Sequence, residues 1–395
     1  MRILWVATKA PWPPGDGGRL VAAVTLEALR ASGHEPTVVA PADPRESDIA
    51  AAAARREGWK SLVLVPAAPA SLPWAALRGS LGRPPVTMRR HALPQVRQAV
   101  VGLLDEGRFD LAHAEQLQAL GPLVEAERRG LPIVLRAQNV ESELWRGASR
   151  APVLGWFLRR EAKRLAAWEG AMVRRVDATI ALTARDAARL AELSGVPDRV
   201  HHVPAPFPSR LPPAGSRLPG SPVVVLLGSE GWWPNRDGAR WFVDRVWPRV
   251  RKDLPQAVLH VRGLKAPAGA GVDARPALAD SREAFADGAV LVVPLRVASG
   301  VRMKILEAWS RGVPVVATPE AALGLEATSG RELLLARQPE DFALALRRVH
   351  VEPGLASALV AAGRDRLAAR HEPRAVAERL LEVYSSAVSR DTIRG

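Results

Sequence analysis

The chain has 395 residues, of which 48% are hydrophobic and 24% are charged, and it contains no cysteine. These values are typical of a globular protein of two or three domains, and they exclude disorder, disulfides, thiolate nucleophiles and cysteine-ligated metal sites. The formal net charge is +14. Because the cations are mostly arginines dispersed along the chain, they favour phosphates, nucleotides or an acidic membrane surface as partners over nucleic acid.

In the first half of the chain, short runs of Val, Ile and Leu alternate with helical segments. The predicted strands are residues 3–7, 37–40, 62–65, 111–114, 132–135, 178–182 and 202–203. The clearest predicted helices are residues 20–31, which Gly33 ends, and residues 157–175. Apolar strands separated by helices are typical of a parallel sheet that is covered on both faces.

A proline-rich stretch follows at residues 204–222, and the alternation then starts again. Strands are predicted at 223–227, 257–261, 289–293 and 313–317, and helices at 235–252, 301–310, 340–350, 354–369 and 373–390. The predicted fold is α/β, with two Rossmann-like domains that face a cleft. Its parts are an N-terminal domain at 1–204, a linker at 205–221, a C-terminal domain at 222–371 and a helix at 372–395.

The turn between the first strand and the first helix is rich in glycine, with the sequence PPGDGGR at residues 13–19. Glycines such as Gly17 and Gly18 let the backbone approach a ligand closely, and the start of a helix favours negative charge. The alternative is an ordinary tight turn between a strand and a helix.

The strongest segment lies between residues 293 and 309, where a strand ends in a loop of small residues and a helix begins. The backbone N–H groups of Ser299, Gly300 and Val301 can bind a diphosphate there. Arg302 adds a bidentate guanidinium and Lys304 a compact positive charge.

Glu307 lies three residues after Lys304, so both side chains are expected on one side of the helix. A carboxylate accepts hydrogen bonds from vicinal hydroxyls, which suits a ribose or a sugar ring. The alternative is an exposed ion pair that stabilises the helix by only a few tenths of a kcal/mol.

In the first half, His113 ends a strand, and Gln138 and Asn139 follow the next one. A histidine can shuttle a proton, but at a strand end it is more often a packed polar residue. The amides can orient a substrate, or Asn139 can cap the helix that follows. One of Trp232 and Trp233, which follow a strand of the second half, can line a cleft.

In combination these segments resemble one family. The sequence GVRMKILEA at 300–308, continuing into GVPVVAT at 312–318, resembles the donor-site signature of the group 1 glycosyltransferases, family 4, which have the GT-B fold. LGS at 227–229 with WPN at 233–235, QNVES at 138–142, the Gly17-Gly18 pair and GHE at 33–35 are similar to further segments of that family.

The resemblance implies a retaining glycosyltransferase that needs no metal and no cofactor. It moves a sugar from a nucleoside diphosphate to a hydroxyl acceptor, in the synthesis of cell-envelope polysaccharide, glycolipid or natural-product glycosides. The sequence agrees in having no Asp-x-Asp motif and no His/Asp cluster at ligand spacing.

The resemblance implies that 1–204 is the acceptor-binding domain and 222–371 the nucleotide-sugar donor domain, and that the helix at 372–395 packs back on the N-terminal domain. It also assigns roles to individual residues. The donor would be bound by Gly17, Gly18, Gly228, Ser229, Ser299, Gly300, Val301, Arg302, Lys304 and Glu307. Gln138, Asn139 and Glu141 would bind the acceptor, and His113 would lie near the reacting sugar, which makes His113, Arg302, Lys304 and Glu307 the expected catalytic residues. Ser299 departs from the family, which carries a glutamate at this position, eight residues before Glu307, and this departure leaves the sugar's identity open.

Five arginines, Arg78, Arg83, Arg89, Arg90 and Arg97, lie among apolar residues. They form either a solvated basic face or a peripheral contact with an anionic membrane, which would place a cytoplasmic enzyme at the inner face of the membrane. Two other functions stay open: a nucleotide-sugar epimerase on the same fold, and a non-catalytic protein that binds nucleic acid or another polyanion.

Overall fold

The computed structural model describes residues 1–71, 84–148, 155–213, 215, 217–278 and 281–392. By its contacts the chain divides into two compact units. Unit 1 comprises Met1–Pro206, Ser299–Val301 and Pro373–Gly395, and unit 2 comprises Phe207–Ala298 and Arg302–Glu372. Each unit has its own sheet, and we describe the two separately.

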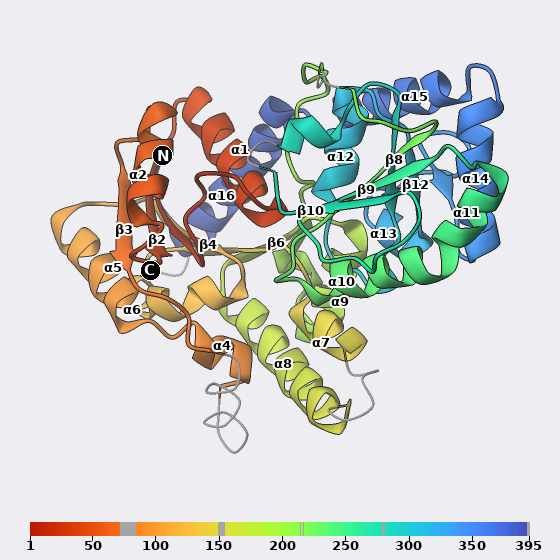
Figure 1. The fold of residues 1–395 in the computed structure, drawn as a ribbon. Coiled ribbons are helices and arrows are strands. Elements are labelled where there is room, and N and C mark those ends of the chain that lie inside the picture. Colours follow the sequence, from red (N-terminus) through yellow and green to blue (C-terminus); the bar gives the residue numbers. More distant parts are fainter. Residues whose placement is uncertain (72–83, 149–154, 214, 216, 279–280, 393–395) are drawn as a thin grey trace. The chain divides into compact units, whose positions relative to one another are not determined.

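The sheet of unit 1 has seven strands within the described residues, in the order β3-β2-β1-β4-β5-β6-β7, and all of its pairings are parallel (Figure 1). The strands are β1 (Arg2–Ala7), β2 (Glu35–Ala42), β3 (Leu62–Pro66), β4 (Leu111–Glu115), β5 (Ile133–Ala137), β6 (Ala178–Ala181) and β7 (Val200–His202). The helices are α1 (Gly17–Ala31), α2 (Ser47–Arg56), α4 (Val86–Arg90), α5 (Pro94–Glu106), η1 (Leu117–Leu123), α6 (Val124–Arg128), α7 (Glu141–Ala148), α8 (Gly155–Arg175), α9 (Ala184–Ser194), η2 (Pro197–Arg199) and α16 (Pro373–Thr392).

The central strand β1 shows why this sheet is covered on both faces. Ile3 and Trp5 pack into one core together with α1, α2 and α16, whereas Leu4 and Val6 pack into a second core with α5 and α8. Because successive side chains of a strand point to opposite faces, a continuous apolar strand needs helices on both sides. The C-terminal helix α16 supplies part of the first core, so it packs on unit 1.

The sheet of unit 2 has six strands in the described residues, again all parallel, in the order β10-β9-β8-β11-β12-β13. The strands are β8 (Val223–Leu227), β9 (Val258–Arg262), β10 (Val272–Arg275), β11 (Ala289–Val293), β12 (Val315–Ala317) and β13 (Leu334–Leu335). The helices are α10 (Trp233–Trp241), the π-helix η3 (Phe242–Val246), α11 (Trp247–Asp253), η4 (Ser281–Ala284), α12 (Met303–Arg311), α13 (Pro319–Ala322), α14 (Pro339–Val351) and α15 (Leu355–Arg370).

These two parallel sheets confirm the predicted class of two Rossmann-like α/β domains. Some boundaries differ from the prediction. Helix α1 begins at Gly17 rather than near residue 20, because Asp16 accepts the amide protons of Gly18 and Arg19 and so caps the helix. Helix α12 begins at Met303, and the edge strands β10 and β13 were not predicted. In the part of the chain that is described, no helix has the length and apolar character that crossing a bilayer requires.

Candidate active site

In both sheets the strand order reverses once, between β1 and β4 in unit 1 and between β8 and β11 in unit 2. Ligands of open α/β sheets bind beyond the carboxyl ends of the strands at such a reversal. The residues that follow these four strands therefore define a candidate site in each unit.

Lys304 connects the two strands of the reversal in unit 2. It lies on α12, which follows β11, and its ammonium donates to the carbonyl oxygen of Leu227 at the end of β8 and to Oδ1 of Asn235, 3.1 Å away. Both acceptors are neutral. Burial and the neighbouring positive charge of Arg302 lower the pKa of Lys304 to about 7. A half-buried cation with only neutral partners favours an anionic ligand, which would raise its pKa again.

Arg302 immediately precedes α12, and its side chain is fixed by an aromatic ring. The guanidinium carbon lies 4.8 Å from the ring centre of Trp232, within the range of a cation–π interaction. Only 7% of Arg302 is exposed. The structure therefore holds two cations of the predicted donor site, Arg302 and Lys304, in defined positions, and it brings one of the two candidate tryptophans to this site.

Gly228 and Ser229 form the turn after β8, and Asn235 explains why a glycine stands there. A Cβ atom on Gly228 would lie 2.8 Å from Cγ of Asn235 and 2.6 Å from Leu264. The Asn235 side chain donates to the carbonyl oxygen of Ser229 at 3.5 Å while it accepts from Lys304. In the sequence Asn235 stands out only as part of the WPN motif at 233–235, and nothing there indicates its place beside Lys304.

Glu307 is buried and held by two residues that the sequence did not single out. Its Oε1 atom accepts from the hydroxyl of Ser281 at 2.8 Å and from Nε of Arg311 at 2.9 Å. The side chain is therefore not half of an exposed pair with Lys304. No hydrogen bond to its second oxygen, Oε2, occurs within the residues that the structure describes, which leaves this atom able to accept from a ligand hydroxyl.

Ser299, Gly300 and Val301 group with unit 1 by their contacts. The Gly300 amide donates to Oδ2 of Asp186 at 2.9 Å, and the Ser299 hydroxyl accepts from the Val140 amide at 2.9 Å. Gly300 has a φ of 74°, and a Cβ atom there would lie 2.2 Å from the carbonyl oxygen of Gln138, so only glycine fits. The predicted binding of a diphosphate by these amides stays a prediction, since the Gly300 amide already has an acceptor.

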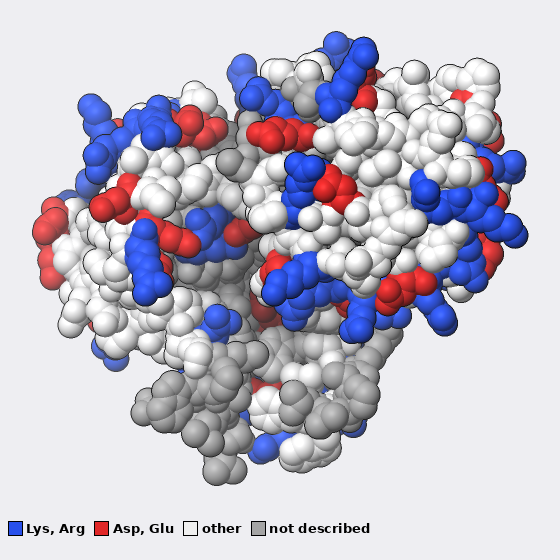
Figure 2. Space-filling model, in the orientation of Figure 1, with Lys and Arg blue, Asp and Glu red and all other residues white. Residues whose placement is uncertain are grey.

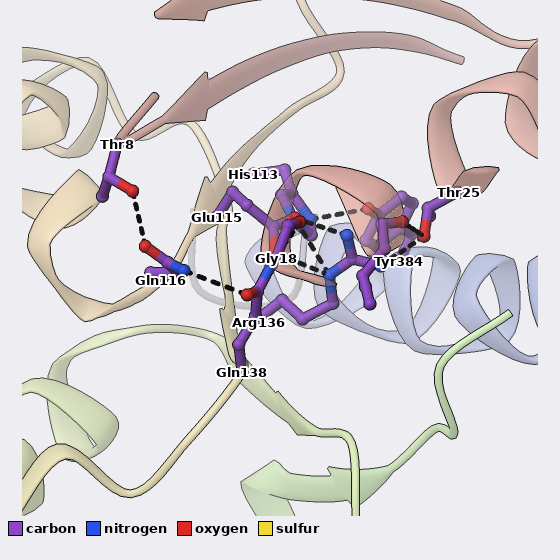
Figure 3. A network of polar contacts seen from close by, with 10 residues as sticks. Thr8, Gly18, Thr25, His113, Glu115, Gln116, Arg136, Gln138 and Tyr384 are labelled. Atoms are coloured by element: carbon purple, nitrogen blue, oxygen red, sulfur yellow. Dashed lines mark hydrogen bonds and ion pairs between the residues drawn. The ribbon is translucent and has the colours of Figure 1, made fainter. Parts of the chain in front are cut away.

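His113 lies in the interior of unit 1 with no exposed area. Its Nε2 is 3.3 Å from Oε2 of Glu115, and its Nδ1 is 2.6 Å from the hydroxyl of Tyr384 (Figure 3). Its ring stacks on Trp5 at a centroid distance of 3.7 Å. Burial lowers the pKa of His113 to about 4, although Glu115 opposes the shift. This placement favours the interpretation as a packed polar residue, and direct contact of His113 with a sugar stays a prediction.

Glu115, next to this histidine, is ion-paired with Arg136 at 2.5 Å. Burial opposes ionisation of Glu115, but the guanidinium of Arg136 keeps its pKa below the usual value. Gln138 donates from Nε2 to Oε1 of Glu115 at 2.7 Å and to the carbonyl oxygen of Gly18 at 3.1 Å. A Cβ atom on Gly18 would lie 2.7 Å from Oε1 of Gln138. The structure thus brings two predicted residues, Gln138 and Gly18, into direct contact, and it places Glu115, which was not predicted, against Gln138.

Gln116 spans the strand reversal of unit 1 and was also missed. Its Oε1 accepts from the hydroxyl of Thr8, after β1, at 2.5 Å, and its Nε2 donates to Oε1 of Gln138, after β5, at 3.0 Å (Figure 3). Its backbone has φ 76° and ψ 154°, a conformation that is nearly confined to glycine. A non-glycine residue in this region costs about 1–3 kcal/mol, and such residues cluster at functional sites.

The remaining predicted residues of unit 1 lie at the starts of two helices. Gly17 is the first residue of α1, whose cap Asp16 is ion-paired with Lys9 at 2.6 Å. Glu141 is the first residue of α7, and its amide donates to Oε1 of the buried Glu169 at 2.6 Å. Burial raises the pKa of Glu141 and brings that of Glu169 to about 7.

Asn139 precedes α7. In the orientation that satisfies both of its neighbours, its side-chain amide donates to the carbonyl oxygen of Ser299 at 2.7 Å. Of the predicted basic residues, Arg78 and Arg83 lie outside the described residues, whereas Arg89 and Arg90 lie on α4 and Arg97 on α5.

Two family descriptions match the sequence, one in each half of the chain. The family described as Glycosyl transferases group 1 matches residues 221–352, and the Glycosyl transferase 4-like domain matches residues 16–206. Together the two matches span most of the chain. No curated protein matches the sequence.

Solved structures share the fold at low sequence identity. Sucrose-phosphate synthase from Thermosynechococcus elongatus superposes with a TM-score of 0.73 at 18% identity, over 98% of this chain and 100% of that chain. HepE from Anabaena, in complex with UDP and glucose, gives 0.69 at 14% identity, over 98% and 100%. The pneumococcal O-GlcNAc transferase GtfA, in complex with UDP and GlcNAc, gives 0.66 at 10% identity, over 98% and 99%.

Proposed function

The chain belongs to the group 1 glycosyltransferases of the GT-B fold, and from this membership we propose that it is a retaining, metal-independent transferase that moves a sugar from a nucleoside diphosphate to a hydroxyl acceptor. The observation that carries the proposal is the pair of fixed cations, Arg302 and Lys304, at the strand reversal of unit 2.

On the donor side, charge develops on the departing diphosphate as the glycosidic bond breaks. The ammonium of Lys304 and the guanidinium of Arg302 are already oriented, so they stabilise this charge without reorganising. Removing one such group typically costs about 10²–10³ in rate. Glu307, whose Oε1 is held by Ser281 and Arg311, presents Oε2 to hydroxyls of the donor. These fixed cations support a mechanism that needs no metal ion and no cofactor.

The comparison structures that contain UDP support a nucleotide-sugar as donor. On the acceptor side we assign Gln138, Asn139 and Glu141, and we add Gln116 because of its strained backbone at the end of β4. The turn residues Gly17, Gly18, Gly228 and Ser229, and the loop Ser299–Val301, keep their assignment to the donor. We propose that unit 1 binds the acceptor and that unit 2 carries the cations and the carboxylate that bind the donor, with residues 205–221 as the linker. The proposed role is in the synthesis of cell-envelope polysaccharide, glycolipid or natural-product glycosides.

The proposal is tested by a thermal-shift screen of the purified protein against UDP-, GDP-, dTDP- and ADP-sugars. A ligand at 100 times its dissociation constant stabilises the folded state by about 2.7 kcal/mol, which gives a clear rise in melting temperature. Lys304→Met and Glu307→Ala should lose this shift and the slow hydrolysis of the donor. Lys252→Met, which removes an exposed lysine of α11, should keep both. The absence of any shift or turnover across the panel would refute the proposal.

An epimerase on the same fold remains the second enzymatic candidate, and product analysis separates the two. Without an acceptor, an epimerase interconverts free nucleotide-sugars, whereas a transferase only hydrolyses its donor slowly.

The distribution of charge on the surface disfavours a polyanion-binding protein. Figure 2 shows Lys and Arg side chains interspersed with Asp and Glu over the visible face, rather than gathered into one basic stripe.

We also propose a peripheral contact with an anionic membrane, and the first turns of α8 in unit 1 support it. Trp156, Arg159, Arg160 and Lys163 follow the spacing i, i+3, i+4 and i+7, so they share one face of this helix. All four are exposed, Trp156 at 69%. The cations of this α8 face have no ion-pair partner among the described residues. Tryptophan and cations on one helical face suit the interface of an anionic membrane leaflet. The cytoplasmic leaflet is anionic, and we propose that the reaction takes place at its surface.

A further inference from the structure

Tyr384 is the only tyrosine of the chain, and it lies on the C-terminal helix α16. It is fully buried in the core that β1 forms with α1 and α16. Its hydroxyl is 2.6 Å from Nδ1 of His113, and the two rings meet edge to face, with centroids 5.8 Å apart (Figure 3). Packing alone would be satisfied by phenylalanine, so the hydroxyl requires an explanation of its own.

The direction of each hydrogen bond around His113 can be worked out from its partners. Glu115 is ionised beside Arg136, and an ionised carboxylate can only accept. Nε2 of His113 must therefore carry the proton that points at Oε2 of Glu115. Burial keeps the imidazole neutral near pH 7, so Nδ1 has no proton and accepts. Burial also raises the pKa of the Tyr384 hydroxyl, which stays protonated and donates to Nδ1.

These bonds continue as far as the glycine-rich turn. Glu115, held by His113 on Oε2, accepts from Gln138 on Oε1 at 2.7 Å. Gln138 in turn donates to the carbonyl oxygen of Gly18 at 3.1 Å and accepts from Gln116 at 3.0 Å. A hydroxyl on the last helix is thus connected, through the side chains of His113, Glu115 and Gln138, to the Gly18 turn and to Gln116.

We propose that Tyr384 is a positioning residue of the unit 1 site: by holding His113 in the Nε2–H tautomer it fixes the Glu115 carboxylate, and through it Gln138, against the Gly18 turn. The C-terminal helix is then a functional part of the acceptor-side unit as well as a part of its core. This inference rests on the proposed function only for its kinetic consequence, because the hydrogen bonds themselves can be measured without any substrate.

The test compares Tyr384→Phe, which removes only the hydroxyl, with Val383→Ala, which removes buried apolar atoms of the same helix. NMR of protein labelled with ¹⁵N-histidine and ¹⁵N-glutamine reports the tautomer of His113 and the side-chain amide of Gln138. The two signals are assigned by their loss in His113→Gln and Gln138→Leu. We expect the wild type and Val383→Ala to show His113 protonated at Nε2. In Tyr384→Phe the tautomers should mix and the Gln138 amide signal should shift.

In the transfer or hydrolysis assay, Tyr384→Phe should lower kcat about tenfold and change the KM of the donor by less than about twofold, because a positioning defect acts on the reaction more than on donor binding. Unchanged His113 and Gln138 signals in Tyr384→Phe would overturn the inference, as would a Val383→Ala variant with the same kinetic loss. If no nucleotide-sugar is turned over, the proposed function fails, and the NMR signals alone decide the role of Tyr384.

Discussion

The hydroxyl of Ser281 donates to Oε1 of Glu307 at 2.8 Å and thereby fixes a carboxylate whose other oxygen accepts no hydrogen bond among the described residues. Ser281 comes from η4, in a stretch with little sequence pattern, whereas Glu307 lies in the middle of α12. Arg311 holds the same Oε1 atom from one helical turn further along. Ser281 and Arg311, to which we assign no contact with the substrates, are thus expected to control how well the donor binds.

We therefore predict a graded series at this carboxylate. Glu307→Ala should lower kcat/KM by about 10² or more, because it removes the acceptor of the donor hydroxyls. Ser281→Ala should raise the KM of the donor about three- to tenfold and leave kcat nearly unchanged, since it removes one of the two hydrogen bonds that orient Glu307 and leaves the one from Arg311 in place. Steady-state kinetics with the donor found in the screen measures both. Equal losses in the two variants would show that Ser281 acts in some other way.

The lowered pKa of Lys304 predicts a pH-dependent affinity for nucleoside diphosphates. Its pKa of about 7 in the free protein means that the ammonium loses its proton as the pH rises through 7. Binding a diphosphate must then restore the proton, so the affinity should fall by up to about tenfold per pH unit above this value. Titration calorimetry with UDP between pH 6 and 9, in buffers of different ionisation enthalpy, measures both the affinity and the proton uptake.

Lys304→Arg is the matched control for this effect, because a guanidinium stays protonated over the whole range. Its affinity for UDP can be lower than that of the wild type, but it should not show the fall above pH 7. If both proteins lose affinity in parallel, the titrating group is not Lys304.

The same shift predicts how stability depends on pH. The unfolded chain holds the lysine proton up to its usual pKa near 10.5, whereas the folded protein releases it near 7. Between these values the unfolded state binds more protons, so the contribution of Lys304 makes the folded state more stable as the pH rises. Lys304→Met should be more stable than the wild type at pH 6, and the difference should shrink toward pH 9. Urea unfolding at the two pH values measures it, and a difference that does not change with pH contradicts the prediction.

The strained backbone of Gln116 predicts that a glycine variant is more stable than an alanine variant at this position, the reverse of the usual order. Gln116→Gly and Gln116→Ala both remove the side-chain amide, but only glycine is relaxed at φ 76° and ψ 154°. The glycine variant should therefore be more stable than the alanine variant by about 1–3 kcal/mol. In an ordinary strand or helix glycine is the less stable of the two by about 0.5–1 kcal/mol. Chemical denaturation of the two variants compares them directly.

Activity then decides whether this strain serves the reaction. If the Gln116 amide contacts substrate, both variants should lose kcat/KM to a similar extent, although the glycine variant is relaxed. A fully active Gln116→Gly would show that the amide serves only the hydrogen bonds to Thr8 and Gln138.

The sequence predicted those parts of the molecule that depend on local pattern. The central strands are continuous apolar runs, so β1, β8 and β11 were found almost to the residue. The edge strand β10 has the sequence VDAR and β13 has only two residues, so neither carries a periodic signal. The π-helix η3 lies within the segment 235–252 that was predicted as one continuous helix. It was not predicted, because the sequence does not show a change in helical hydrogen bonding.

The same distinction holds for the site. Arg302, Lys304 and Glu307 are close together in the sequence and follow a predicted strand, so they could be identified. Asn235, Ser281, Gln116 and Tyr384 act through contacts with residues distant in the chain, which only the fold creates. The position of Gln116 directly after a strand at the reversal was the one available signal, and its strained conformation has no counterpart in the sequence.

The last prediction concerns the α8 face of Trp156, Arg159, Arg160 and Lys163. If it contacts a membrane, the protein should sediment with vesicles that contain anionic lipid and should not sediment with neutral phosphatidylcholine vesicles. Each cation near an anionic surface contributes about 1 kcal/mol, so replacing Arg159 and Lys163 by serine should weaken binding by roughly 10- to 30-fold. Trp156→Ser should also weaken it, and high salt should act mainly on the cation-dependent part.

Helix α14 of unit 2 offers a matched control. Leu344, Arg347, Arg348 and Val351 have the same spacing, and Leu344 and Val351 are 49% and 57% exposed. Arg348, however, is ion-paired with Glu352 at 2.6 Å, so this face carries less net charge. Replacing Leu344 and Arg347 by serine should leave sedimentation unchanged. A loss as large as that from the α8 variants would mean that charge and apolar area act without regard to their place on the molecule. The α8 face would then have no special role in binding the membrane.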